Sequence, residues 1–398
     1  MSEKEKNAAL KQTAAPEGKP AAPAKKVKKA KKEKKPKKKG SGLLGRIIRR
    51  FFLVLFTVVI LLVGALALVM NLVFNGPSEA ARKVLTMSLL EPSATKWIPG
   101  LFMDEEVVES IRNASGAELE EEVTDTSLVV ISRSNNLSTD NDEWADYPDG
   151  IRIEEYSGKT FNAHIMLVQD PSRVYMGMST TSYSTSIPGK RLTEAVDETG
   201  AAAGINAGAF YDDGTANSIV GSVPAGLVVS GSQVVWDAYD GLVPEEGFAG
   251  FNEDNILVVA KSMTANEAME QHIRDGCEFG PVLIINGEVN QEVYTGNSGY
   301  NPRTCVGQRS DGVVVFLCID GRQAGSLGGT YKDCIDILLE YGCVNACNMD
   351  GGSSSVMLYR DTYGLYGEAD TVTMVNSYSV MQSQPRRMPN YWLVKPLE

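Results

Sequence analysis

The chain has 398 residues, of which 43% are hydrophobic and 22% charged, and its net charge is −12. This length is enough for one large core or two smaller ones. Only two histidines occur, His164 and His272, and neither lies near another obvious ligand in the sequence, so we expect neither a histidine-rich metal site nor a Ser-His-Asp triad. We assign no metal ligand and expect no cofactor.

Positive charge is concentrated at the N-terminus. Residues 1–50 contain eighteen Lys and Arg against four Asp and Glu, and because the whole chain sums to −12, residues 51–398 carry −26. The Ala, Pro and Lys bias predicts a disordered, lysine-rich cytoplasmic tail over residues 1–46. Because this basic block lies beside an apolar segment, we expect it to contact anionic lipid headgroups rather than nucleic acid.

The apolar segment, residues 51–74, has no charged residue over 24 positions. At about 1.5 Å per helical residue it can cross a bilayer, so we predict a transmembrane anchor over residues 47–75. The preceding positive charges place the N-terminus in the cytoplasm and the rest of the chain outside, as a single-pass protein of the cell membrane. A cleavable signal peptide is the alternative, but its apolar region is usually only about 7 to 15 residues long.

Residues 76–149 are predicted to form a helical stalk followed by an acidic linker. Apolar residues recur at helical spacing over residues 80–90 and 107–111. The stretches GAELEEEVTDTS and RSNNLSTDNDEWADYPDG favour a linker or solvated loop. The compact domain is therefore expected over residues 150–398.

In residues 150–398 most apolar runs are strand-like, for example HIMLV, VLII, VVVFLC and YWLV. Two helices are predicted, over residues 264–276 and 330–342. The expected fold class is α+β: a mixed, mostly antiparallel sheet with a few packed helices, preceded by one transmembrane helix. The strand-helix-strand order over residues 313–359 is similar to a crossover unit.

The six cysteines all lie between residues 277 and 347. No pair has Cys-x-x-Cys spacing, and most adjoin apolar runs, where cysteine behaves as a small hydrophobe. Disulfides are allowed in a domain outside the membrane. We expect buried thiols, with room for one bridge, and no cysteine nucleophile.

Two apolar strands are followed by Asp-Gly. VVVFLCIDGR ends in Asp320, and CVNACNMDGG ends in Asn348 and Asp350. Two such strands would bring both carboxylates to one rim, where ligand sites of open sheets gather. Gly351 and Gly352 permit left-handed backbone angles, so that amides there could face an anion, and the serines that follow add hydroxyl donors. The alternative is that each Asp-Gly only makes a turn.

Two further stretches are candidates for a site. Arg303, in NPRTCVG, would hold a guanidinium at a strand end, where it can bind phosphate or carboxylate oxygens, or else form a structural ion pair. Asn206, in AAAGINAGAFYDDG, lies among small residues that permit close approach of a ligand or, alternatively, a tight core turn.

The strings INAGAFYDDG, GPVLIINGEV, NPRTCVGQRSDG, IDGR and NACNMDGGSSSVM, taken in order, resemble the phosphodiester glycosidase family over roughly residues 150–396. The resemblance implies an enzyme that cleaves a sugar from a sugar 1-phosphodiester. It implies catalytic roles for Asp320, Asp350 and Arg303. It implies substrate binding by Asn206, Gly208, Thr304, Gly321, Asn348, Gly351, Gly352 and Ser353. Ala209, Met349 and Ser353 depart from the usual residues of the family motifs.

The expected function is that of a membrane-anchored extracellular hydrolase acting on a phosphate-linked glycan, in cell-envelope or exopolysaccharide metabolism. In a glycosyl phosphodiester the leaving group is a weak base, so charge neutralisation matters more than a strong general acid. The residues leave open which carboxylate is nucleophile or base. The alternative is a non-catalytic glycan-binding or envelope-assembly protein that uses the same site.

Overall fold

The computed structural model describes residues 43–92, 94–113, 122–131, 143–211, 221–240, 247–378 and 384–397. Almost all of the expected tail, residues 1–46, lies outside the described residues, as do parts of the expected linker, residues 114–121 and 132–142. The boundaries assigned to tail, anchor, stalk and domain therefore stay predictions.

The first helix, α1 (Leu43–Phe74), contains the apolar segment. Over Gly45–Phe74 it is long and apolar enough to cross a membrane, and none of its most apolar stretch is buried against protein. This confirms one candidate transmembrane helix ahead of the domain.

Two helices follow in the expected stalk. They are α2 (Glu79–Leu90) and α3 (Glu105–Arg112), with a 3₁₀ turn at Pro99–Leu101 between them. Helix α2 begins at Ser78, whose hydroxyl accepts a hydrogen bond from the N–H of Ala81.

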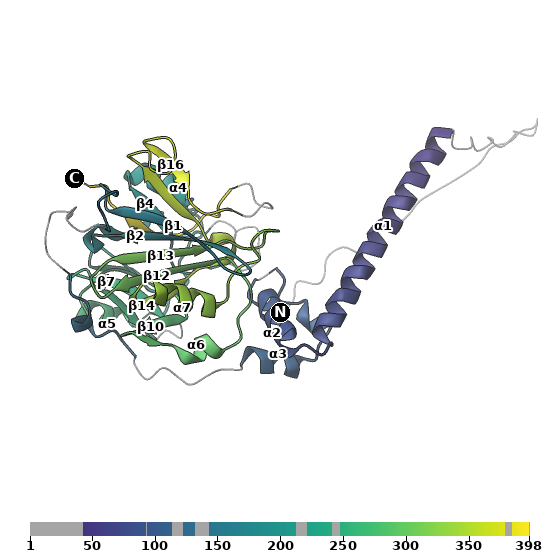
Figure 1. Ribbon diagram of the computed structural model, residues 1–398, viewed down its shortest axis with the longest axis horizontal. Helices are drawn as coiled ribbons and strands as arrows, with labels where there is room; N and C mark the ends of the chain where they lie inside the picture. The colour runs from purple at the N-terminus through teal and green to yellow at the C-terminus, as the bar shows by residue number, and fades with distance from the viewer. Residues whose placement is uncertain are drawn as a thin grey trace, which may run out of the picture. The chain divides into compact units, whose positions relative to one another are not determined.

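The central sheet has seven strands. In spatial order they are β1 (Ile151–Ser157), β2 (Asn162–Val168), β13 (Val314–Ile319), β12 (Arg303–Arg309), β14 (Cys343–Met349), β10 (Val282–Ile285) and β11 (Glu288–Val289). Figure 1 shows β1, β2, β13, β12, β14 and β10 in this order, with α7 lying beside β12, β14 and β10.

Strand β13 is a continuous apolar run rather than an alternating one because both of its faces are buried. Val314, Phe316 and Cys318 pack into one core cluster, and Val315 and Leu317 pack into another. Successive side chains of a strand point to opposite faces, so both faces of the sheet are buried at this strand.

Two five-stranded sheets complete the domain. One has the order β16 (Thr371–Met374), β15 (Met357–Asp361), β4 (Ala203–Asn206), β17 (Asn390–Val394) and β3 (Val174–Met178). The other has the order β6 (Gln233–Trp236), β5 (Val228–Ser230), β9 (Ile273–Glu278), β7 (Phe248–Asn252) and β8 (Leu257–Ala260). Every pairing between these named strands is antiparallel.

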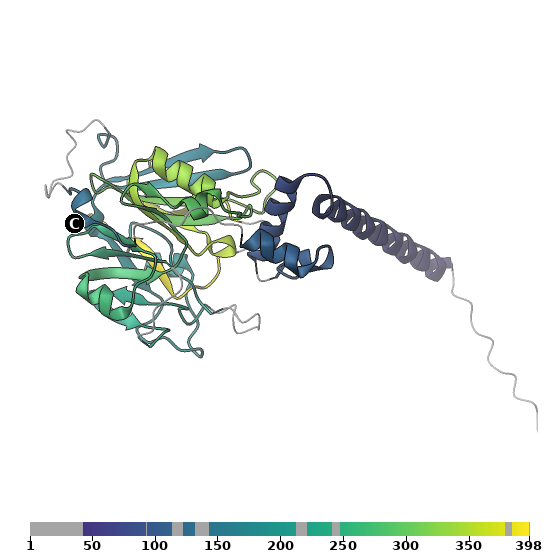
Figure 2. The ribbon, with the colours of Figure 1, turned by 90° about the horizontal axis from the view of Figure 1, so that it is seen from below.

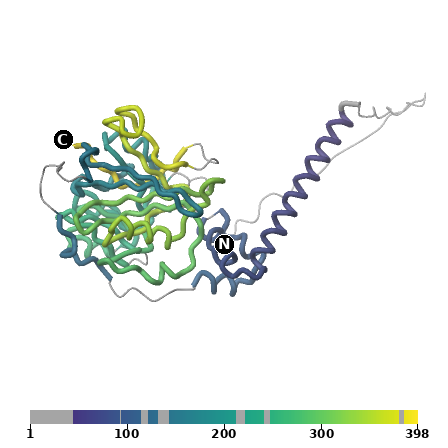
Figure 3. The backbone as a smooth tube through the Cα atoms, viewed as in Figure 1, coloured from purple at the N-terminus to yellow at the C-terminus, as the bar shows by residue number. Residues whose placement is uncertain are grey.

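Figure 2 shows the chain from below, and Figure 3 draws the backbone as a tube that ends in yellow at the C-terminus. The last strand, β17, pairs with β3 and β4 on either side, so the C-terminal segment is an interior strand of its sheet. The three sheets enclose a common core to which Phe251, Phe316 and Trp392 each contribute from a different sheet. The α+β class with mostly antiparallel sheets is confirmed.

The remaining helices are short. They are α4 (Leu192–Thr199), α5 (Ala265–Glu270), α6 (Gln291–Thr295) and α7 (Tyr331–Glu340). Helix α7 packs its buried residues, Ile335 and Leu338 among them, on the seven-stranded sheet. Thr330 caps it: its hydroxyl accepts a hydrogen bond from the N–H of Asp333, and its own N–H donates to the Asp333 carboxylate.

The helix expected over residues 264–276 is wrong in its second half. Helix α5 ends at Glu270, His272 takes a left-handed φ of 53°, and the chain enters strand β9 at Ile273. Residues 273–278 are nearly all buried and pair with β7, and this sheet pairing prevails over local helical spacing.

Two residues of the expected linker belong to the folded core. Trp144 is 3% exposed and packs against the same cluster as α7. Asp149 is buried and accepts a hydrogen bond from the Tyr359 hydroxyl. Packing of the domain therefore reaches upstream of residue 150.

All six cysteines are buried and none forms a disulfide. Burial raises the pKa of the Cys277, Cys305 and Cys318 thiols well above the ordinary value. The expectation of buried thiols is confirmed, and the one bridge for which it left room is not formed.

Candidate active site

The site residues meet because of how β12, β13 and β14 are arranged. Strand β12 pairs antiparallel with both of its neighbours, so β13 and β14 run parallel to each other and end at the same edge. Asp320 and Asp350 are the residues that follow those ends. Arg303 begins β12 opposite Ile319 and so lies at this edge too. The expected common rim is present.

Asp320 is enclosed at this edge. It is 3% exposed, and its Oδ1 accepts a hydrogen bond from the N–H of Ser377 (2.9 Å). Its Oδ2 lies 3.2 Å from Nε2 of His164. His164 belongs to β2, and nothing near it in the sequence indicated that it would meet a carboxylate. Both carboxylate oxygens are therefore occupied by groups of the protein itself.

Arg303 is also enclosed. Its Nε donates to the carbonyl of Gly329 (3.1 Å), and its Nη2 donates to the carbonyl of Gly299 (2.8 Å) and lies 2.9 Å from Oε2 of Glu91. Its guanidinium carbon lies 4.1 Å from the ring centroid of Tyr331. Burial alone would lower the pKa of Arg303, but Tyr331 and the Glu91 carboxylate outweigh burial and raise it.

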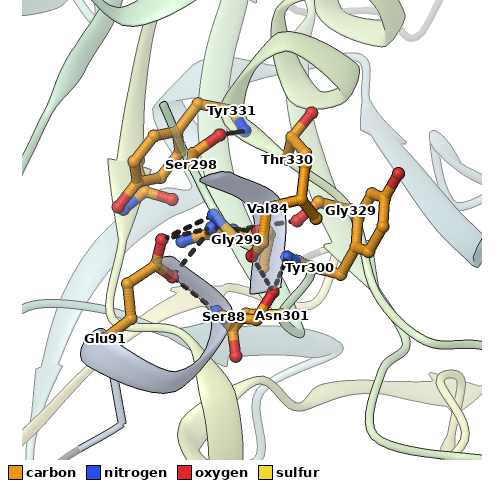
Figure 4. A network of polar contacts seen from close by, with 12 residues as sticks. Val84, Ser88, Glu91, Ser298, Gly299, Tyr300, Asn301, Gly329, Thr330 and Tyr331 are labelled. Atoms are coloured by element: carbon orange, nitrogen blue, oxygen red, sulfur yellow. Dashed lines mark hydrogen bonds and ion pairs between the residues drawn. The ribbon is translucent and has the colours of Figure 1, made fainter. Parts of the chain in front are cut away.

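Glu91 comes from the end of helix α2 and reaches the loop before β12 (Figure 4). Its Oε1 accepts from the N–H of Gly299 (3.0 Å), and its Oε2 accepts from Nδ2 of Asn301 (2.6 Å). Ser88, one turn earlier, accepts from the N–H of Tyr300 (2.8 Å). A Cβ atom on Gly299 would lie 2.1 Å from Ser88 N, so only glycine permits this packing.

Asn206 holds both ends of the loop that begins at Asp350. Its Nδ2 donates to the carbonyl of Asp350 (2.5 Å), and its Oδ1 accepts from the N–H of Val356 (3.1 Å) and from the Thr304 hydroxyl (2.9 Å). Asn206 and Thr304 are fully buried. Their side chains fix the loop from behind.

Asn348, Gly208 and Gly321 lie at packed positions. The Asn348 amide donates to a backbone carbonyl (2.8 Å), and the N–H of Gly208 donates to Oδ1 of Asn390 (2.9 Å). A Cβ atom on Gly321 would lie 2.6 Å from Pro302 N, so a side chain there would collide with backbone. These three residues set the shape of the edge.

The loop from Asp350 to Ser353 is partly exposed. Gly352 has a φ of 63°, and its N–H donates to the carbonyl of Pro302 (2.9 Å). In the second part of the loop, the hydroxyls of Ser354 and Ser355 are buried and have no hydrogen-bond partner among the described residues. Asp350, Gly351, Gly352 and Ser353 are thus the expected site residues that solvent reaches.

Sequence reasoning singled out no role for Glu91, His164, Arg322, Tyr378 or Arg386, although all five lie at or beside this edge. Arg322 had a signal, since it directly follows Asp320-Gly321 in the string IDGR. In the part of the chain that the structure describes, no group of three or more His, Cys, Asp or Glu could hold a metal ion.

An α+β domain with a reachable carboxylate and several arginines at the end of parallel strands is suited to a polar, anionic ligand. Residues 199–395 match the sequence model of the phosphodiester glycosidase family. The chain belongs to this family through that domain.

One curated relative is the SPbeta prophage-derived uncharacterized protein YomE of Bacillus subtilis strain 168, 30% identical over 136 residues. The match covers 33% of this chain and 21% of that relative, so the chain spans only about a fifth of the relative's length.

Solved structures that the chain matches include the zebrafish N-acetylglucosamine-1-phosphodiester alpha-N-acetylglucosaminidase catalytic domain, auto-inhibited by its pro-peptide. The identity is 17%, the TM-score 0.47, and the match covers 62% of this chain and 82% of that one. A hypothetical protein from Synechocystis matches at 15% identity and a TM-score of 0.39, covering 62% and 61% of the two chains.

Proposed function

We propose that this domain hydrolyses a sugar 1-phosphodiester. The observation that carries the proposal is the position of Asp350, which is partly exposed at the end of β14 in a loop whose two ends Asn206 holds. This loop lies inside the region that matches the family. A reachable carboxylate on a backbone that is held in place suits chemistry at an anomeric carbon.

In the proposed reaction the bond between the anomeric carbon and the phosphate oxygen breaks, and its electron pair leaves with the phosphate monoester. Water adds to the anomeric carbon and releases a proton. The phosphate monoester is a weak base, so little help from a general acid is needed. Asp350 stabilises the positive charge that develops on the sugar or takes the proton of the water.

The proposal divides the expected site residues by what they touch. Asp350, Gly351, Gly352 and Ser353 meet the substrate. The enclosed residues hold the edge in shape, and they are Asn206, Gly208, Arg303, Thr304, Asp320, Gly321 and Asn348.

The setting is proposed from the N-terminal segments. Helix α1 anchors the chain in the cell membrane, the lysine-rich tail faces anionic lipids in the cytoplasm, and the domain acts outside on an envelope glycan or exopolysaccharide. Protease added to intact cells should then remove the C-terminal domain and leave an N-terminal tag. Loss of the tag with survival of the domain would mean the opposite orientation, and absence of α1 from the mature protein would identify a signal peptide.

Turnover tests the activity. The full chain in detergent is mixed with the methyl phosphodiester of α-N-acetylglucosamine 1-phosphate, and free sugar and methyl phosphate are measured. Equal release of both by the wild type, and release that is about 10²- to 10⁴-fold slower in Asp350→Asn, supports the proposal. Binding of several such glycosyl phosphodiesters with no release from any of them would favour a non-catalytic glycan-binding protein instead.

A further inference from the structure

Two arginines from distant parts of the chain flank the Asp350 loop. Arg322 follows β13, and its Nη2 would lie 3.0 Å from a Cβ atom on Gly352. Arg386 precedes β17, and its Nη1 lies 3.4 Å from Oγ of Ser353. The loop therefore has a guanidinium at Gly352 and another at Ser353.

Arg322 is held in place by its neighbours. Its Nη2 donates to Oδ1 of Asn301 (3.0 Å), and Asn301 in turn donates to Glu91, so the orientation of the Asn301 amide is fixed from both sides. Arg322 has a left-handed φ of 58°, which is uncommon for a residue other than glycine. A strained backbone that keeps a long cationic side chain beside a reachable loop is typical of a functional position.

Arg386 is held by an aromatic ring. Its guanidinium carbon lies 4.7 Å from the ring centroid of Phe210, within the range of a cation–π interaction. The Tyr378 hydroxyl donates to the carbonyl of Ser353, so the loop backbone at Ser353, which Arg386 contacts, is held in place as well.

Nearby arginines have carboxylate partners, and Arg322 does not. Arg303 pairs with Glu91, and Arg387 pairs with Glu194 (3.0 Å). Arg322 makes no ion pair within the described residues. Its pKa is lowered by partial burial and by the charges of Arg303 and Arg386, with Glu91 and Asp350 opposing the shift.

An anion that binds beside like charges reduces the repulsion between them. A guanidinium presents several N–H groups in one plane, which match the oxygens of a phosphate. The buried, unpartnered hydroxyls of Ser354 and Ser355 lie in the same loop and leave further donors unused.

We propose that Arg322 and Arg386 bind the phosphate group of the substrate, one on each side of the Asp350 loop. This assignment rests on the proposed function and replaces the expected role of Arg303, whose guanidinium is buried against Glu91. The sugar then lies toward Asp350. As the bond to the anomeric carbon breaks, the leaving phosphate gains negative charge, so the two arginines bind the transition state more tightly than the substrate.

The test measures anion binding apart from turnover. Binding of α-glucose 1-phosphate to the full chain is measured by calorimetry, with uncharged methyl α-glucoside and with glucuronate as the other probes. We expect the phosphate probe to bind most tightly. Arg322→Gln and Arg386→Gln should each weaken its binding about 10- to 100-fold with melting temperatures near wild type. Arg387→Gln, next in sequence but paired with Glu194, is the matched control and should keep binding.

The outcomes separate this proposal from the proposed function. Loss of phosphate binding in both variants with no turnover by the wild type would support the anion site and reject the hydrolase. Turnover with phosphate binding unchanged in both variants would keep the hydrolase and overturn the anion site. Preference for glucuronate over the phosphate would overturn it too, as would loss of binding only in Arg303→Lys at an unchanged melting temperature.

Discussion

The edge where β13 and β14 end holds two kinds of charged residue. Asp320 and Arg303 form an enclosed pair: both are under 5% exposed, and their polar atoms bind His164, Ser377, Glu91 and backbone carbonyls. Asp350 and Arg322 are the accessible pair, meaning only that solvent reaches both side chains: Asp350 is partly exposed, and Arg322 is exposed. Both pairs lie at the same edge of the sheet, and each consists of one carboxylate and one guanidinium.

A residue's position at a strand end therefore does not by itself determine its role. A charge whose hydrogen bonds are completed inside the protein stabilises the fold, because removing it leaves its partners buried and unpaired. A charge that solvent reaches can exchange water for a ligand. Variants of the accessible pair should therefore change activity or binding, and variants of the enclosed pair should change stability.

The largest effect is expected for Asp350→Asn. The change keeps the size of the side chain and removes its charge, so kcat should fall about 10²- to 10⁴-fold while the melting temperature stays near wild type. Steady-state kinetics and thermal unfolding of the same preparation check this. An unchanged kcat would place Asp350 in a simple turn and erase the distinction between the two pairs.

The next effect is expected for Glu91→Gln, which leaves the buried Arg303 without its carboxylate. We expect a loss of about 3 kcal/mol in the free energy of unfolding, measured by urea unfolding of the full chain. Glu79→Gln is the matched control on the same helix, because the Glu79 side chain is exposed, and it should leave the unfolding midpoint unchanged. A gain in kcat with unchanged stability in Glu91→Gln would instead show that this carboxylate competes with the substrate for Arg303.

A smaller effect is expected for Asp320→Asn. The amide keeps an oxygen for the N–H of Ser377 but loses the charge that faces His164, so stability should fall by about 1 to 2 kcal/mol. The kcat of the folded protein should fall less than tenfold. A collapse of kcat as deep as that of Asp350→Asn, at wild-type stability, would move Asp320 into the accessible class.

The smallest effect is expected for the thiols. All six cysteines are buried, and burial raises the pKa of Cys277, Cys305 and Cys318, so the thiols should be unreactive near neutral pH. A mild alkylating agent should leave kcat unchanged, and mass spectrometry of the native protein should find no label. Labelling that abolishes turnover and that substrate prevents would identify a thiol at the site.

The sequence was enough to predict the fold class and the common edge, because both depend on local pattern. Strand β13 is uninterrupted by polar residues, and the helix between β13 and β14 gives the crossover that makes them parallel. Strands β7 and β9 escaped prediction. Each contains a glycine, Gly250 or Gly276, which weakens the strand pattern, and the two glycines pair across the sheet beside the ring of Phe248.

The division into enclosed and accessible residues could not be predicted, because it depends on contacts between distant segments. Glu91 and Arg303 are 212 residues apart, and Asp320 and His164 are 156 apart. Nothing near Glu91 in the sequence indicates that its carboxylate will meet a buried arginine. Arg322 could have been found, since it follows the same Asp-Gly that pointed to Asp320.

The contact of helix α2 with the loop before β12 sets where a protease could shed the domain intact. A cut in residues 75–78, ahead of α2, would release a fragment that still carries Glu91 and Ser88 against Gly299 and Tyr300. A cut after Glu91 would release a shorter fragment in which the loop before β12 is uncovered. The buried guanidinium of Arg303 would then have lost the carboxylate of Glu91. The length of the shed product would therefore decide whether it remains folded.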